Sequence, residues 1–127
     1  MEPQPRYLIE ELCRFNNGSP GRLGSHFRKN RDANLKFIQD VGPLFLAHTL
    51  GHYPIVANNI SKYSANQLYA FGFHKSRTTV EQYYLVKHNI TLRFPHLPCI
   101  IMNGGFVVGQ ENIKHLSFFP IECISIN

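Results

Sequence analysis

The stretch TTVEQYYLVKHNITLRFPHLPC (78–99) combines a helix start with a cluster of polar aromatic and basic side chains. It opens with two overlapping capping boxes, Thr-x-x-Glu and Thr-x-x-Gln, in which paired side chains satisfy the free amides of a helix N-terminus. The pattern predicts a helix that runs to about His88, with Val80 and Leu85 facing the core. The stiff loop FPHLPC follows this helix.

The end of the predicted helix presents side chains that suit a phosphate group. Tyr83 and Lys87 are four residues apart, as are Tyr84 and His88, so each pair meets on the helix surface. Phenol, ammonium and imidazole groups all donate hydrogen bonds, and a phosphate accepts them. The alternative is that these tyrosines are half-buried core residues with the hydroxyl at the surface.

The charge of the chain is concentrated around this cluster. The 127 residues suit a single domain over 1–127, with 43% hydrophobic and 17% charged residues. The formal net charge is +5, and residues 41–110 hold five Lys and Arg residues against one acid, Glu81. A basic balance of this kind favours a polyanionic partner.

An aromatic stripe precedes the helix. In NQLYAFGFHK (66–75), Tyr69, Phe71 and Phe73 alternate with smaller residues, which predicts a strand with one aromatic face. Flat aromatic faces bind unstacked bases, each stack contributing ~1–3 kcal/mol. Donors and stacking faces together predict single-stranded nucleic-acid binding, although such a stripe is also typical of a core.

Residues for catalysis or for a metal are sparse. His48 and His52 have the spacing of zinc ligands, but only two scattered cysteines could complete the set, so we expect neither a metal nor a cofactor. Metal-dependent nuclease chemistry needs clustered carboxylates, which the middle of the chain lacks. A metal-free ribonuclease remains an alternative, with His48 and His88 as acid and base and Lys87 holding the phosphate.

The order of the predicted elements indicates an α+β fold. PRYLIEELCRF predicts a first helix that NNGSPG ends, and Ser25 predicts the N-cap of a second that Gly42-Pro43 ends. Short strands with Gly and Pro corners follow, which favours a small barrel. The strand-like runs are 43–48, 53–58, 66–75, 90–94, 99–102, 106–109 and 121–126.

The cysteine content and the lack of a long apolar run indicate in which cellular compartment to expect the protein. The chain has three cysteines and no C-x-x-C pair, which fits a reducing compartment such as the cytoplasm, the nucleus or both. No signal peptide and no run long enough to span a bilayer is present, so we expect no membrane partner.

Together with VGQENIKHLSFFPIE (108–122), the opening stretch resembles the PAZ domain of the Argonaute/PIWI proteins, as a divergent member. Upstream, RYLIEELCRF resembles the first helix of that family and GPLFLAH resembles its first barrel strand. YPIVANNISKYSANQLYAF resembles the Tyr-x-Val strand that leads into the β-hairpin of the family. The resemblance spans nearly the whole chain in order, and it implies that the chain is one piece of a larger protein.

The resemblance implies a fold and a binding site. The fold is a small OB-like β-barrel with two N-terminal helices and an inserted β-hairpin/helix module. A cleft between barrel and insert would hold the last two nucleotides at the 3′ end of a single-stranded small guide RNA. By resemblance, the donors to the linking phosphate would be His48, Tyr53, Tyr83 and His88, with added charge from Lys87.

The remaining roles implied by the resemblance concern the terminal nucleotide. Tyr69 or Phe71 would stack on its base or sugar, and Phe119 would line the pocket. The implied role is anchoring rather than cleavage, next to other domains of a parent Argonaute-like protein. A degenerate relative that uses the same surface for protein contacts is the alternative.

The chain departs from the family pattern near two of these residues. His88 stands where tyrosine is commoner, and imidazole still donates a hydrogen bond. Gly51 and His52 precede Tyr53 where the family is rich in Lys and Arg, and Pro54 stands where arginine is common. We expect the missing cations to weaken the grip on RNA and flatten its salt dependence.

Overall fold

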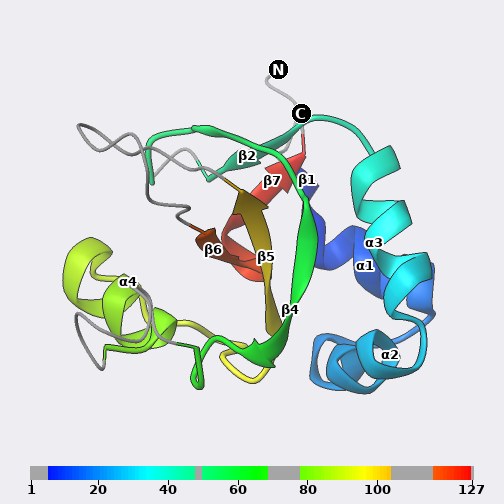
Figure 1. Cartoon of the computed structure of the whole chain (residues 1–127), viewed down its shortest axis with the longest axis horizontal. Helices are drawn as coiled ribbons and strands as arrows, with labels where there is room; N and C mark the ends of the chain where they lie inside the picture. The colour runs from blue at the N-terminus through cyan, green and yellow to red at the C-terminus, as the bar shows by residue number, and fades with distance from the viewer. Residues whose placement is uncertain (1–5, 48–49, 69–77, 104–115, 127) are drawn as a thin grey trace.

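The structure, a computed structural model, describes residues 6–47, 50–68, 78–103 and 116–126. Helices and antiparallel sheets are both present, which confirms a mixed α and β fold (Figure 1). The elements in chain order are β1 (Arg6–Tyr7), α1 (Leu8–Asn16), η1 (Pro20–Arg22), α2 (Leu23–Lys29), α3 (Arg31–Asp40), β2 (Leu44–Leu46), β3 (Pro54–Ile55), β4 (Asn59–Ser64), α4 (Val80–His88), β5 (Pro98–Asn103), β6 (Leu116–Pro120), η3 (Ile121–Cys123) and β7 (Ile124–Ile126).

The strands form two sheets, one with the order β1-β7-β2-β3 and one with the order β4-β5-β6. Within the described ranges they do not close into a barrel, so the expected OB-like barrel is not confirmed. The helices α1, α2 and α3 lie together on one side of these sheets, and α4 lies on the other side (Figure 1). The fold therefore separates α4 from the layer formed by α1, α2 and α3, which we call the helical layer.

From Arg6 onward, where the described residues begin, three α-helices rather than the expected two precede β2. The first ends as predicted, because Asn17 adopts the left-handed conformation (φ 52°) and its amide donates to the Arg14 carbonyl. The predicted second helix was wrong at its start, since α2 begins at Leu23 and the Ser25 hydroxyl donates to the carbonyl of Arg22 inside the helix. Asn30 (φ −131°, ψ 48°) then breaks the segment in two.

A hydrogen bond between two side-chain amides, one of them buried, joins α1 to α3. Asn34 is fully buried on α3, and its side-chain oxygen accepts from Asn16 Nδ2 at 2.7 Å. Its own Nδ2 donates to the Asn30 carbonyl at 2.8 Å, so the buried amide is satisfied on both sides. Around it, apolar residues at helical spacing such as Leu8 and Leu12 face the sheets.

Several strand predictions differ from the structure, because long-range pairing decides where strands form. β4 and β6 were not predicted from the sequence, and 90–94 is not a strand. Residues 66–68 form a turn, whereas the rest of the predicted aromatic strand and the predicted strand at 106–109 lie outside the described residues. The predictions near 44–46, 54–55, 98–103 and 124–126 are confirmed as β2, β3, β5 and β7.

A buried serine bridges the irregular pairing of β4 with β5. The register shifts between Ile60 and Ser64. At the shift, the Ser61 hydroxyl accepts from the Cys99 amide at 2.7 Å and donates to the Tyr63 carbonyl at 2.6 Å. The side chain thus replaces the ladder bonds that the bulge removes.

The strand β3 is at the edge of its sheet. The amide of Leu46 donates to the Tyr53 carbonyl at 2.8 Å, and Pro54 lies opposite Phe45. Just after the strand, the Val56 amide donates to Met102 Sδ at 3.4 Å, which ties this edge to β5 of the other sheet. Across the part of the chain that the structure covers, no helix is long and apolar enough to cross a bilayer.

Candidate functional site

The helix α4 begins with a complete capping box. The Thr79 hydroxyl accepts from the Gln82 amide at 3.2 Å, and the Gln82 side chain accepts from the Thr79 amide at 3.0 Å. Of the two overlapping boxes in the sequence, this second one is therefore the one that forms. The next two free amides, of Val80 and Glu81, donate to the carbonyls of Leu68 (2.8 Å) and Ala65 (3.0 Å). The start of α4 is thereby fixed to the turn that follows β4.

The other end of α4 is fixed through the FPHLPC loop. Asn89 ends the helix in the left-handed conformation (φ 56°). The carboxylate of Glu122 then accepts from the amides of Arg93 and Phe94, each at 2.9 Å. The Asn66 amide donates to the Pro95 carbonyl at 3.1 Å, so the loop is held from two directions.

Sequence reasoning missed this role of Glu122. Its carboxylate occupies the two amides of 93–94, which explains why the predicted strand at 90–94 does not form. The only sequence signal is a lone acid in the apolar segment SFFPIECISI. Charge-assisted bonds of this type are stronger than neutral ones, so Glu122 holds the loop that supports α4.

A compact ring cluster lies on the last turns of α4. The ring centroids of Tyr83 and His88 are 5.9 Å apart with the rings nearly perpendicular. Those of Tyr84 and His88 are 5.2 Å apart, so the predicted contact between these two is present. Lys87, next to His88, is exposed. The structure thus brings a phenol and an imidazole together beside an ammonium.

The two tyrosines of the cluster differ in burial. Tyr84 is 4% exposed and packs with Val80 into the core, one helical turn apart. Leu85 is 48% exposed, so the prediction that it faces the core was wrong. Burial, followed by the charges of Cys123 and Cys99, raises the pKa of the Tyr84 phenol. Tyr84 is therefore a packing residue, and Tyr83, half-buried, is the tyrosine nearer the surface.

The electrostatics of the cluster favour an anion at the side chains. The only carboxylate on α4 is Glu81, which lies in the first turn. Lys87 and His88 lie in the last turn, where the partial negative charge of the helix C-terminus favours cations. Because the carboxylate of Glu122 is already engaged by two backbone amides, it is not directed at the cluster.

The other predicted site residues are distributed over both sheets. Tyr53 lies immediately before β3 and is 50% exposed. Phe119 is half-buried on β6, the strand against which α4 packs. The predictions for His48, Tyr69 and Phe71 fall outside the described residues.

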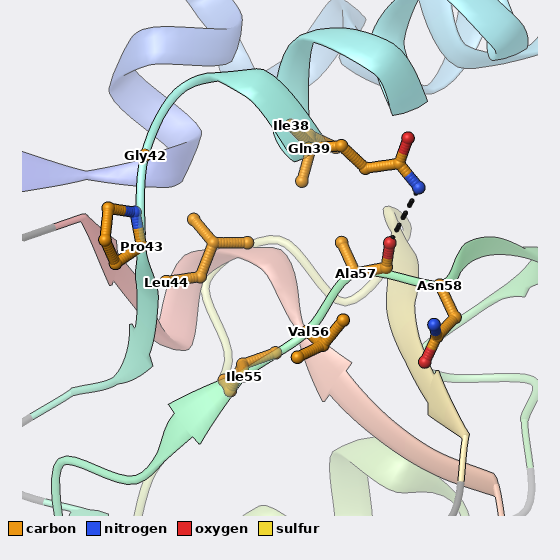
Figure 2. Close-up of a pocket in the computed structure, with 9 residues that line it drawn as sticks. All are labelled: Ile38, Gln39, Gly42, Pro43, Leu44, Ile55, Val56, Ala57 and Asn58. Atoms are coloured by element: carbon orange, nitrogen blue, oxygen red, sulfur yellow. Dashed lines mark hydrogen bonds between the residues drawn. The ribbon is translucent and has the colours of Figure 1, made fainter.

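A cavity of about 390 Å³ lies elsewhere, between α3 and the segment that contains β3 (Figure 2). Gln39 closes one side by donating to the Ala57 carbonyl at 2.9 Å. Its walls are the residues Ile38, Gln39, Gly42, Pro43, Leu44, Ile55, Val56, Ala57 and Asn58. None of these is ionisable and none is a predicted site residue, so we place no chemistry there. In the described part of the chain, no group of His, Cys, Asp and Glu could hold a metal ion.

Comparison with known proteins gives a family match over more than half of the chain. The family model for the PAZ domain matches residues 53–127. Piwi-like protein ergo-1 of Caenorhabditis elegans is 40% identical over 57 residues. That segment is 45% of this chain and 5% of the worm protein, so the chain spans a small part of that relative.

Solved structures with the same fold come from Drosophila. The PAZ domain of Argonaute2 aligns with a TM-score of 0.59 at 21% identity, covering 96% of this chain and 98% of that one. A structure on 3′ end recognition of nucleic acids by the Argonaute 2 PAZ domain gives 0.56 at 21%, covering 99% and 97%. The Ago PAZ domain in complex with 3′-end 2′-O-methylated RNA gives 0.57 at 22%, covering 98% and 99%.

Proposed function

The chain belongs to the PAZ domain family, and on this basis we propose that it is a non-catalytic module that anchors the 3′ end of single-stranded small guide RNA. The observation that carries the proposal is the cluster of Tyr83, Lys87 and His88 at the end of α4. The Drosophila relatives support it, since their PAZ domains recognise the 3′ ends of nucleic acids.

The chemistry of the cluster fits a phosphodiester group. The Tyr83 hydroxyl and a ring N–H of His88 are hydrogen-bond donors, and Lys87 adds an ammonium on the last turn of α4. Donors aimed at a phosphate oxygen form charge-assisted hydrogen bonds, which are roughly twice as strong as neutral ones. We assign these three residues to the phosphate that links the last two nucleotides.

The remaining contacts would surround the terminal nucleotide. Tyr53 and His48 would complete the phosphate donors, and Phe119 would line the pocket on β6. Tyr69 or Phe71 would stack on the terminal base or sugar. In this arrangement the pocket surrounds the terminal nucleotide with its ribose. The module would therefore bind an end of the strand rather than its interior.

Anchoring fits the site better than cleavage. An acid–base ribonuclease needs two groups on opposite sides of the scissile phosphate. His88 instead packs against the rings of Tyr83 and Tyr84 on the same helix, which suits a fixed donor. We place the module in RNA silencing within a larger Argonaute-like protein of the cytoplasm or the nucleus.

The test is equilibrium binding of a labelled single-stranded RNA with a free 3′ hydroxyl end. The matched ligand is the same RNA carrying a 3′-terminal phosphate, and a 5′-phosphorylated RNA controls for charge alone. We expect the 3′ phosphate to weaken binding and the 5′ phosphate to leave it unchanged. Equal affinity for all three RNAs would show that the end is not captured. Absence of any binding at low salt by the folded protein would favour a role in protein contacts.

A further inference from the structure

The turn before Tyr53 contains two consecutive residues in the left-handed region. Gly51 has φ 111° and His52 has φ 54°. The amides of Leu50 and His52 both donate to the Ala47 carbonyl, at 2.8 and 3.3 Å, which closes the turn. A backbone with φ near 111° is one that residues with a side chain rarely adopt, so this turn requires a glycine.

The ring of Tyr53 lies directly over Gly51. A Cβ atom added to Gly51 would be 2.3 Å from Tyr53 Cε2 and 3.0 Å from Cδ2 and Cζ. Real Cβ atoms do not approach other atoms this closely, so the ring occupies space that only glycine leaves open. Because Tyr53 is half exposed, the core alone does not fix its ring, and the turn supplies one wall.

The turn is itself held to the sheet. The imidazole of His52 stacks on the ring of Phe45 in β2, with centroids 4.5 Å apart and planes within 6°. The Tyr53 carbonyl accepts from the Leu46 amide at 2.8 Å. The backbone on both sides of the tyrosine is therefore anchored to β2, and a shift of the turn would move the Tyr53 ring.

We propose that Gly51 is a positioning residue for Tyr53, and that it sets where the Tyr53 hydroxyl meets the RNA phosphate. This proposal rests on the proposed function. It adds that the turn at Gly51 determines the orientation of the Tyr53 ring. Gly51 has no side chain that could donate to a phosphate, so its own contribution to binding is through geometry. Gly51 acts through Tyr53 and does not itself touch the RNA.

The experiment is a double-mutant cycle with Gly51→Ala, Tyr53→Ala and the double variant. RNA affinity and the thermal midpoint are measured for each. Gly24→Ala in α2 is the matched control, because a Cβ there meets no atom within 4 Å and its φ is not in the left-handed region. We expect Gly51→Ala to weaken binding of the 3′ end by about tenfold, as loss of one bond to a charged group does. In the Tyr53→Ala background, Gly51→Ala should change affinity little.

The two readouts separate the possible failures. The inference is overturned if Gly51→Ala binds RNA as the unmodified protein does, or if it weakens binding equally with and without the Tyr53 ring. If the unmodified protein binds no RNA, the proposed function fails, and the thermal midpoints still test the geometry. In that case Gly51→Ala must lower the midpoint less when Tyr53 is alanine, because the clash is gone and only backbone strain remains. Equal losses in both backgrounds would refute the contact.

Discussion

Tyr83 and Tyr84 are adjacent on α4 and have different environments. The ring of Tyr84 is buried with Val80, whereas Tyr83 is half-buried and meets the imidazole of His88 edge-on. A helix turns by about 100° per residue, so two neighbours of the same type face different surroundings. The side chain at position 83 is thus the one nearer the surface, and the one at 84 holds the helix to the core.

The first prediction concerns the hydroxyl of Tyr83. Tyr83→Phe keeps the ring contacts and removes one donor, so we expect RNA 3′-end affinity to fall by ~1.5–3 kcal/mol, the contribution of a hydrogen bond to a charged oxygen. Tyr63→Phe is the control, because Tyr63 is an exposed tyrosine on β4. Fluorescence anisotropy with labelled RNA measures both. An unchanged affinity for Tyr83→Phe would make Tyr83 a packing residue.

The second prediction concerns the buried thiols of Cys99 and Cys123. Burial is the main cause that raises the pKa of each thiol from 9.0 to about 12. In the unfolded chain both ionise near pH 9, while in the folded protein they stay neutral. Their contribution to stability is therefore complete below pH 9 and declines as the pH rises towards 12.

Urea unfolding at pH 8 and pH 10 checks this sign. We expect a lower midpoint at pH 10 for the unmodified protein. The double variant Cys99→Ala/Cys123→Ala is the control, since it lacks both thiols and should lose less stability over the same interval, whatever its starting value. A pH response identical in both proteins would mean that other groups determine the loss.

At the scale of elements, α4 depends on bonds at both of its ends. Its start is capped by Thr79 and fixed to the turn at 65–68, and its end continues into a loop held by Glu122. With only nine residues it is too short to be stable alone. The positions of the site residues on the last turns of α4 therefore depend on these bonds at its two ends.

The third prediction tests the N-terminal attachment of α4. Thr79→Ala removes the side-chain half of the capping box, so we expect a loss of ~1 kcal/mol in unfolding free energy. RNA affinity should fall in parallel, because fraying of α4 disperses Tyr83 and His88. Thr91→Ala, at an exposed position in the following loop, is the control. Loss of stability with no loss of affinity would uncouple the helix start from the site.

Local signals allowed α4 with its N-terminal capping box, and α1 with its C-terminal end, to be predicted from the sequence. Capping boxes and left-handed Asn residues act within four positions, so they can be recognised without the fold. The break at Asn30, the strands β4 and β6 and the loop at 90–94 depend on distant partners. The bonds from Glu122 to Arg93 and Phe94 span 29 and 28 residues, and no local pattern contains them.

The same reasoning applies to the candidate site. Residues Tyr83, Lys87 and His88 were predicted together because helical spacing places them together. In the sequence, Gly51 stood out only because it occupies a position where the family is rich in Lys and Arg. Its positive φ and the Tyr53 ring that lies over it are visible only in the structure. Which of the two tyrosines is buried depended on how α4 packs, and the sequence left that open.

At the scale of the whole molecule, the net charge of +5 contrasts with a single Lys or Arg residue on α4, Lys87. The fourth prediction is that RNA binding depends weakly on salt, because few cations lie at the site. Each neutralised phosphate adds ~0.7 to the slope for single strands, so Lys87→Ala should reduce the slope by about that amount. Lys36→Ala, exposed on α3 in the helical layer, should leave it unchanged. A reduction by the Lys36 variant would show that the RNA also contacts the helical layer.

At its β3 edge, the four-stranded sheet offers no free backbone donor to a further strand along the described residues 54–56. The bond from the Leu46 amide to the Tyr53 carbonyl makes that pair a hydrogen-bonded one, so the backbone nitrogen of the next residue points outward from the sheet. That residue is Pro54, which has no N–H, and the next outward amide, of Val56, already donates to Met102 Sδ. An incoming β-strand finds no free donor on this stretch, which guards the domain against edge-to-edge aggregation in a crowded cell.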